Sequence, residues 1–263
     1  MDLGIKDRVA IVAASSKGLG KAVAYGLARE GVQLALCART EAPLNATVEE
    51  IRAATGVQVF GKALDVTRPA QVSQFVRETA GRFGKVDICV TNAGGPPAKT
   101  FAETTIEDWH AAANLNLMSA VYFAREVLPL MQKQKWGRLI TITSAAVKQP
   151  MDNLVLSNSV RSAVSGLVKS LANEYAKDNI LVNNVCPGYT LTARLEDLSK
   201  RMAGTEGVDA HAIQARWTNQ IPMRRLGRPE ELAAVVVFLA SECASYVTGT
   251  SIAIDGGLVK GVY

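Results

Sequence analysis

Two residue types that build metal sites and catalytic triads are scarce in this sequence of 263 residues. It has only two histidines, His110 and His211, which excludes a His-rich metal site and leaves little material for a Ser-His-Asp triad. We predict no bound metal and expect both histidines at the surface. The four cysteines show no metal-ligand spacing, and those at positions 37, 89 and 186 fall within predicted strands. We therefore expect reduced core thiols in a cytoplasmic protein.

Long apolar runs and clustered charge are also missing. No apolar stretch approaches the length of a membrane span, and the first seven residues lack the basic and apolar regions of a signal peptide. The net charge of +5 is mild, and the lysines and arginines are dispersed without interleaved aromatic residues. The sequence therefore predicts neither a membrane nor a nucleic-acid partner.

Strands and helices alternate along the whole chain. Short, β-branched apolar runs predict strands at 9–14, 32–38, 57–66, 86–91, 138–144, 180–186 and 250–255, and helical spacing predicts helices after the first strand and at 42–54, 69–82, 105–133, 154–177 and 229–240. Apolar strands separated by helices favour a parallel sheet covered on both faces. With no break in composition, we predict one α/β Rossmann domain over 1–263, a doubly wound seven-stranded sheet.

One stretch, 190–228, is irregular, charged and punctuated by glycine. Long excursions of this kind often form substrate loops. A pair of short surface helices is the plainer interpretation, and the two are compatible. We predict a substrate loop here.

The first strand leads into a turn suited to phosphate. Ser15 to Gly20 separates the strand from an apolar helical pattern, so the turn would aim backbone N–H groups and the positive end of a helix dipole at one point. A tight turn without a ligand is the alternative for this motif taken alone.

The end of the second strand bears on the choice of dinucleotide. An NAD site needs an acid there for the ribose hydroxyls, whereas an arginine accommodates a 2′-phosphate. No acid lies between Leu34 and Thr40, and Lys17 and Arg39 could clamp a phosphate. Two solvated surface cations are the alternative. We predict NADPH as the cofactor, with NAD less favoured.

Several motifs in register resemble the short-chain dehydrogenase/reductase family, in particular its 3-oxoacyl-(acyl-carrier-protein) reductase-like branch, over essentially the whole chain. They are the turn 14–20, Asp65-Val66, Asn92-Ala93-Gly94, Asn116, Ser144, Pro187-Gly188 with Thr192, and residues 254–257. The resemblance implies Asn116 and Ser144 as catalytic residues. With the charged pair above, the predicted cofactor-binding residues are Ala14, Ser16, Lys17, Gly18, Leu19, Gly20, Arg39, Thr40, Asp65, Val66, Asn92, Ala93, Gly94, Arg161, Pro187, Gly188, Thr190 and Thr192.

One departure from the family pattern is Ala14, which stands where the family turn has its first glycine. Alanine is the smallest replacement. We expect an ordinary φ at this position and a slight shift of the loop without loss of binding.

The other departure concerns the chemistry. Counted from Ser144 without a gap, the family's catalytic Tyr-x-x-x-Lys pair falls on Ser157 and Arg161, still one helical turn apart. An alcohol is a far weaker acid than a phenol, and a guanidinium does not relay protons near neutral pH. Loss of a general acid costs about 10²–10⁴-fold in rate. Alternatively, Ser157 and Arg161 only pack and hold the cofactor.

Three interpretations of the function remain open. The first is an NADP(H)-dependent oxidoreductase acting on a carbonyl/alcohol pair through Ser144, Ser157 and Arg161, with Arg161 and Lys148 available to an anionic small-molecule substrate. The second is a non-catalytic dinucleotide-binding protein, and the third a nucleotide-assisted lyase or epimerase on the same fold. Tyr189 could replace the missing phenol. The resemblance implies a homotetramer packed through helices 105–133 and 154–177.

Overall fold

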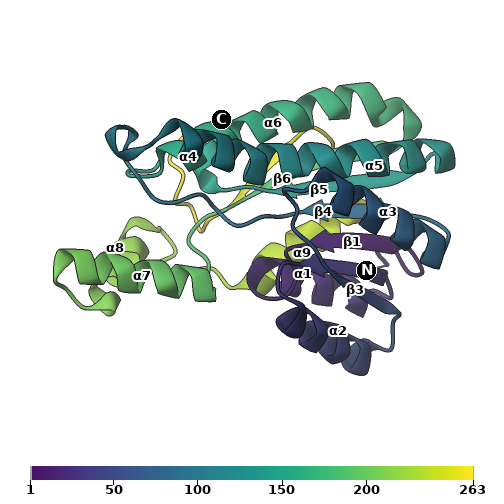
Figure 1. The fold of residues 1–263 in the computed structure, drawn as a ribbon, viewed down its shortest axis with the longest axis horizontal. Helices are drawn as coiled ribbons and strands as arrows, with labels where there is room; N and C mark the ends of the chain where they lie inside the picture. The colour runs from purple at the N-terminus through teal and green to yellow at the C-terminus, as the bar shows by residue number, and fades with distance from the viewer. Residues whose placement is uncertain (1, 263) are drawn as a thin grey trace.

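A seven-stranded sheet lies between two layers of helices in the computed structural model, which describes residues 2–262 (Figure 1). The spatial order is β3-β2-β1-β4-β5-β6-β7, and every neighbouring pair is parallel. The strands are β1 (Val9–Ala13), β2 (Gln33–Ala38), β3 (Val59–Ala63), β4 (Ile88–Thr91), β5 (Gly137–Ile142), β6 (Ile180–Pro187) and β7 (Ser251–Ile254). The predicted doubly wound α/β fold is confirmed. The strand order reverses between β1 and β4, which is where sheets of this type bind ligands.

The strands are apolar because both faces of the sheet are covered. Strands β1, β4, β5 and β6 are buried along their whole length. Side chains alternate between the faces, so Ala10 and Val12 join one apolar core while Ile11 joins the other. The first core takes side chains from α1 (Gly18–Arg29), α2 (Glu41–Thr55) and α9 (Pro229–Ala240). The second takes them from α3 (Pro69–Phe83), α5 (Ser119–Gln134) and α6 (Val155–Tyr175).

The helix predicted over 105–133 is interrupted, so that prediction was wrong in one respect. It consists of α4 (Ile106–Ala112), a π-helical turn (Ala113–Met118) and α5. The turn carries Asn116, whose side chain is buried and donates to the carbonyl of Gly94. Such bulges often occur at functional sites, because the extra residue re-aims a side chain without ending the helix.

The excursion at 190–228 contains two helices, α7 (Ala193–Glu206) and α8 (Ala210–Gln220), which extend from the body of the molecule (Figure 1). They enclose a small apolar core that includes Ile213 and Trp217. A β-bridge between Thr190 and Gly227 joins the two ends of the excursion. The excursion is therefore an ordered helical pair beside the carboxyl end of the sheet.

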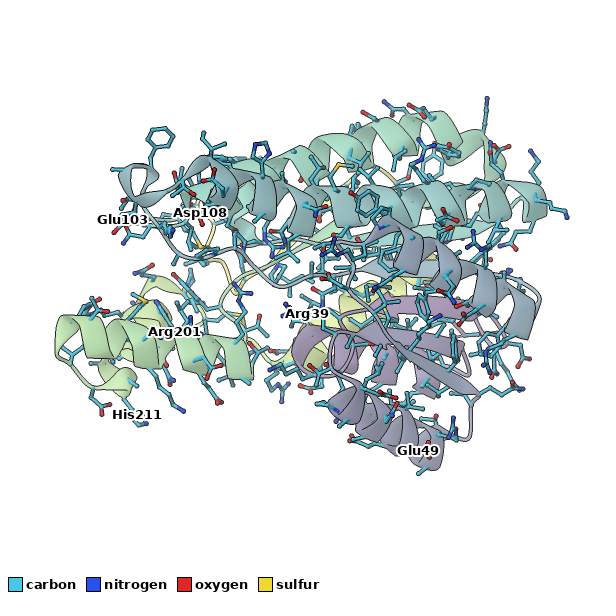
Figure 2. The ribbon with its side chains drawn as sticks, in the orientation of Figure 1. Arg39, Glu49, Glu103, Asp108, Arg201 and His211 are labelled. Atoms are coloured by element: carbon cyan, nitrogen blue, oxygen red, sulfur yellow. The ribbon has the colours of Figure 1, made fainter. Side chains whose placement is uncertain are left out.

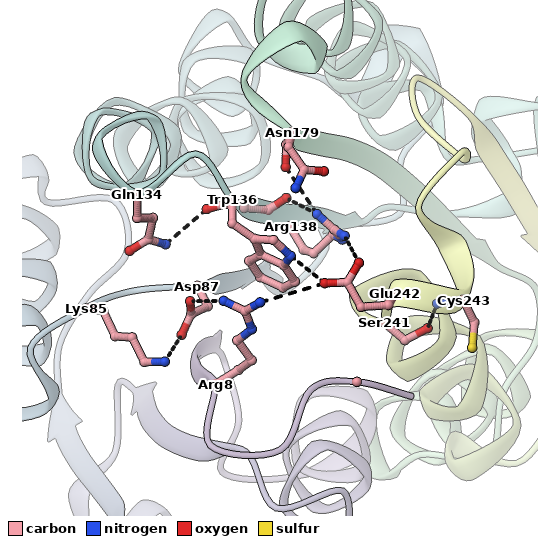
Figure 3. Close-up of polar contacts among 12 residues, drawn as sticks. Arg8, Lys85, Asp87, Gln134, Trp136, Arg138, Asn179, Ser241, Glu242 and Cys243 are labelled. Carbon is pink, nitrogen blue, oxygen red and sulfur yellow. Dashed lines mark hydrogen bonds and ion pairs between the residues drawn. The ribbon is translucent and has the colours of Figure 1, made fainter. Parts of the chain in front are cut away.

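At the amino ends of the central strands, a charged network surrounds Trp136 (Figure 3). The guanidinium groups of Arg8 and Arg138 lie 3.7 and 4.1 Å from the centre of the indole ring, and the indole Nε1 donates to Glu242 at 2.7 Å. Burial lowers the pKa of Arg138 to about 10, although Glu242 opposes the shift. This network joins the amino ends of the central strands and leaves their carboxyl ends for the site.

Three cysteines lie in the core and both histidines lie at the surface, as the sequence analysis predicted. Cys37, Cys89 and Cys186 are buried free thiols, and both histidines are exposed. Between residues 2 and 262, no helix is long and apolar enough to cross a bilayer, and no three His, Cys, Asp or Glu side chains are grouped for a metal ion.

Candidate active site

The turn after β1 forms a backbone cradle that only glycine can complete. Gly18 has a φ of 58°, a conformation that favours glycine. A Cβ at Gly20 would lie 2.9 Å from the carbonyl carbon of Ala14, which is too close. Lys17 is the N-cap of α1 and its side chain makes no capping bond, so the first N–H groups of the helix stay available. The cradle suits an anion such as a dinucleotide pyrophosphate.

The expectation of an ordinary φ at Ala14 was wrong. Ala14 adopts a φ of 51°, in the left-handed region. The carbonyl of Ala14 packs against Gly20, and β1 directly precedes the residue. An alanine in this region costs roughly 1–2 kcal/mol. The backbone at Ala14 is therefore strained.

Three cations lie in the segments that follow β1, β2 and β3 at the carboxyl end of the sheet. Arg39 and Thr40 are exposed after β2, and Lys17 is exposed at the start of α1. The sequence analysis missed one of the three cations, Arg68. The charges of Arg68 and Arg39 both lower the pKa of the Asp65 carboxyl group, which indicates that the two cations lie on the same side of the site.

Asp65 is held in its ionised form. Burial opposes ionisation, but hydrogen bonds from the backbone N and Oγ1 of Thr67, at 2.9 and 2.8 Å, and the charges of Arg39 and Arg68 lower its pKa overall. Its neighbour Val66 packs in the apolar core, as does Leu19 of the first turn. The side chain of Val66 is thus buried away from a ligand, and that of Leu19 is partly buried.

The loop after β4 is joined to two predicted catalytic residues. The carbonyl of Gly94 accepts one hydrogen bond from Asn116 Nδ2 at 2.8 Å and one from Arg161 Nη2 at 3.3 Å. Asn116 comes from the π-helical turn and Arg161 from α6, so one backbone oxygen connects three segments that are distant in sequence.

Arg161 is a buried cross-link. Its Nη1 donates to the carbonyls of Thr143 and Ile142, at 2.9 and 3.4 Å, in addition to the bond from Nη2 to Gly94. Burial lowers its pKa to about 10, and Arg194 adds to the shift, which the Cys186 thiol opposes. The guanidinium therefore stays charged at neutral pH, with most of its donors bound to backbone.

Two serines are also among the predicted catalytic residues. Ser144 Oγ accepts a hydrogen bond from the N–H of Ala146 at 3.1 Å, which leaves its own O–H proton free to be donated. Ser157 is buried on α6, one turn before Arg161. A cavity of about 10 Å³, room for one water molecule, is lined by Asn116 and Arg161 among others. Asn116 Oδ1 is a buried acceptor without a partner in residues 2–262, so it can bind a donor from a ligand.

The loop after β6 closes against the first turn. A Cβ at Gly18 would lie 3.5 Å from the methyl group of Thr192, so these two loops are in contact. Thr192 Oγ1 also caps α7 through the N–H of Leu195. Gly188 is required here because a Cβ would lie 2.9 Å from the Cα of Asp255. The loops after β1 and β6 thus meet at the carboxyl end of the sheet, where sheets of this type bind ligands in a crevice.

Tyr189 is poorly suited to act as a proton donor. Its ring stacks on Trp217 of α8, with centroids 5.1 Å apart. Burial and the nearby charge of Asp152 raise the pKa of its hydroxyl, whereas a proton donor in this chemistry needs a lowered pKa.

A second residue that the sequence analysis missed is Arg194, on the first turn of α7. A Cβ at Gly95 would lie 2.8 Å from its Cζ, so the guanidinium packs on the backbone of the β4 loop. No motif marks this position, and only the return of the excursion over the sheet brings it there.

Comparisons with known proteins agree with this architecture. The family model described as enoyl-(acyl carrier protein) reductase matches residues 13–259. The chain is 32% identical over 258 residues to the 3-oxoacyl-(acyl-carrier-protein) reductase FabG of Aquifex aeolicus, an alignment that spans 98% of this chain and 100% of that protein.

Solved structures are similar throughout their length. The L-sorbose reductase of Gluconobacter frateurii, in complex with NADPH and L-sorbose, superimposes with a TM-score of 0.95 at 35% identity and covers 100% of both chains. An actinorhodin polyketide ketoreductase variant with NADPH gives a TM-score of 0.93 at 30% identity, covering 98% of this chain and 100% of that one.

Proposed function

Because the chain belongs to the short-chain dehydrogenase/reductase family, we propose that it is an NADP(H)-dependent oxidoreductase that interconverts a carbonyl and an alcohol through a rebuilt proton-donor site. The observation that carries the proposal is the shared carbonyl of Gly94, which ties Asn116 and Arg161 to the loop beside the cofactor crevice. The crevice is assembled as a turnover site needs, although the usual phenol is absent.

The residues present fit an NADP(H) molecule. Gly18 and Gly20 keep the cradle open for a pyrophosphate, and Lys17, Arg39 and Arg68 provide positive charge for a 2′-phosphate. The Asp65 carboxylate accepts hydrogen bonds from Thr67, and the three positive charges outnumber its single negative charge. The L-sorbose reductase and the polyketide ketoreductase were both solved with NADPH, which supports the same cofactor here.

When bound, the cofactor supplies the hydride, and the chain must then stabilise the negative charge on the substrate oxygen. Ser144 is suited to this role because its O–H is free to donate while its oxygen is fixed by Ala146. Ser157 offers a second hydroxyl from α6. Arg161 contributes a buried positive charge and holds the β4 and β5 ends in place.

The test is NADPH oxidation, followed by its absorbance, with a panel of neutral ketones and oxo acids, together with product analysis. Turnover that yields the alcohol supports the proposal. Tight NADPH binding without turnover of any carbonyl would favour the non-catalytic interpretation, and a product formed without net cofactor oxidation would favour a lyase or epimerase.

We further propose a cytoplasmic homotetramer packed through α4–α5 and α6. Several apolar residues of α5 and α6 remain only partly buried, among them Tyr122, Leu130 and Leu171, as expected of helices that also face a partner. Three buried free thiols suit a reducing compartment. Size-exclusion chromatography with light scattering tests the assembly.

A further inference from the structure

Four cations on α6, α7 and the segment after β5 have no carboxylate partner within residues 2–262. Within residues 2–262, no ion pair involves Arg161, Arg194, Arg201 or Lys148. Other arginines do form ion pairs, namely Arg8, Arg52, Arg138, Arg216, Arg225 and Arg228. Unpaired cations are ordinary on an open surface. Here two of them, Arg161 from α6 and Arg194 from α7, meet on one loop, which requires a reason.

The convergence is centred on Gly94 and Gly95. Arg161 Nη2 donates to the Gly94 carbonyl at 3.3 Å from one side. From the other side, Arg194 Nη1 lies 3.6 Å from the position of a Cβ on Gly94, and its Cζ lies 2.8 Å from that position on Gly95. Two guanidinium groups therefore flank a single residue of the β4 loop.

The charges of these groups act on one another's pKa values and on that of a neighbouring thiol. Arg194 adds to the lowering of the pKa of Arg161. Although Arg194 is exposed overall, desolvation lowers the pKa of its own guanidinium, ahead of repulsion from Arg201. Lys148 and Arg161 both lie near the Cys186 thiol, where they oppose the effect of burial on its pKa. Arg201 lies on α7, the same helix as Arg194 (Figure 2).

The two arginines differ in what they can still bind. Arg161 uses its Nη groups on three backbone carbonyls. Arg194 donates no hydrogen bond to another group in residues 2–262, and its planar fork can take a carboxylate by two parallel bonds. The free guanidinium lies on Gly95, next to the carbonyl that anchors Asn116, so an anion held there would be near the reacting centre.

We propose that Arg194 binds the carboxylate of the substrate, and that the substrates are 2-oxo acids, in which a carboxylate adjoins the reacting carbonyl. This inference rests on the proposed function for the identity of the reaction but not for the binding site, which is built from the chain alone. A phosphate of the dinucleotide is the other anion that could reach Arg194, so the experiment must separate the two.

The experiment is calorimetric titration with oxamate, which has the carboxylate of a 2-oxo acid but an amide that hydride does not reduce, and with its neutral counterpart oxamide. Both are titrated into the protein alone and with NADP⁺, and NADPH is titrated separately. The variants are Arg194→Gln and Gly95→Ala, whose methyl group would occupy the position of the guanidinium. The matched control is Lys200→Gln, which removes one exposed positive charge from the same helix.

We expect oxamate to bind the wild type in preference to oxamide. Arg194→Gln should weaken oxamate binding about 10- to 100-fold, the loss of a charge-assisted contact, and Gly95→Ala should weaken it in the same direction. Lys200→Gln should bind oxamate as the wild type does, and all variants should keep the NADPH affinity and thermal midpoint of the wild type.

Three results would overturn the inference: equal binding of oxamate and oxamide, unchanged oxamate binding in Arg194→Gln, or a loss in Arg194→Gln confined to NADPH, which would place the guanidinium on the cofactor. Failure of the proposed function gives a different result. In that case NADPH does not bind or is not oxidised, while oxamate still binds the protein alone.

Discussion

Arg161 and Asn116 donate to the same backbone oxygen, the carbonyl of Gly94, at 3.3 and 2.8 Å. Because Arg161 also donates to Thr143 and Ile142, its guanidinium connects the carboxyl ends of β4 and β5. Arg161 therefore has a defined structural role, in addition to the positive charge that it keeps in the site.

The first prediction concerns this cross-link. Arg161→Met should lower the free energy of unfolding by about 3 kcal/mol, because the carbonyls of Gly94, Ile142 and Thr143 lose a charged donor, and the last two are buried. Arg161→Lys should recover only part of the loss, since an ammonium group cannot span the same three oxygens. Urea denaturation measures both variants. Stability equal to the wild type in Arg161→Met would show that these contacts contribute nothing.

The second prediction concerns the strained turn. Ala14→Gly should raise the free energy of unfolding by up to about 1 kcal/mol, because glycine adopts the φ of 51° without penalty. Ala13→Gly is the control: it lies in the buried strand β1, where glycine should destabilise. Denaturation midpoints of the two variants should move in opposite directions. A midpoint that falls in both variants would show that the φ of Ala14 costs the folded protein no stability.

The third prediction concerns the cofactor. Wild-type protein should bind NADPH more tightly than NADH, and Arg39→Asp should reverse the preference by placing an acid at the end of β2. Arg68→Gln should weaken NADPH binding without affecting NADH. Fluorescence titration gives the affinities. An NADH preference that Arg39→Asp leaves unchanged would exclude the 2′-phosphate clamp.

The fourth prediction concerns the hydroxyl of Ser144. Ser144→Ala should keep the affinity for NADPH and lower kcat/KM about 10²–10³-fold, the usual loss of one donor to a developing oxyanion. Ser162→Ala, on the exposed side of α6, is the control and should turn over like the wild type. Full activity in Ser144→Ala would exclude this residue from the mechanism.

Much of this could be predicted from the sequence because the sheet is covered on both faces, so its strands are apolar runs. The helix at 229–240 was predicted with its observed bounds. The π-helical turn at 113–118 was not, since its hydrophobic spacing is not separable from that of an α-helix. The φ of Ala14 was mispredicted because the residue type suggested an ordinary turn. The positions of Arg194 and Arg68 depend on tertiary packing that no local pattern records.

The measurement that tests the central claim most directly is kcat/KM for neutral ketones and 2-oxo acids with wild type, Ser157→Tyr, Arg161→Lys and the double variant. If the site has been rebuilt for its own substrate, the wild type should reduce an oxo acid. The double variant should lose that activity, since a ring would fill the pocket and the guanidinium would be gone. Each single change should have a smaller effect than the pair. A wild type inert on every oxo acid, with a double variant that gains activity on neutral ketones, would show instead the remains of an eroded Tyr/Lys site and contradict the account.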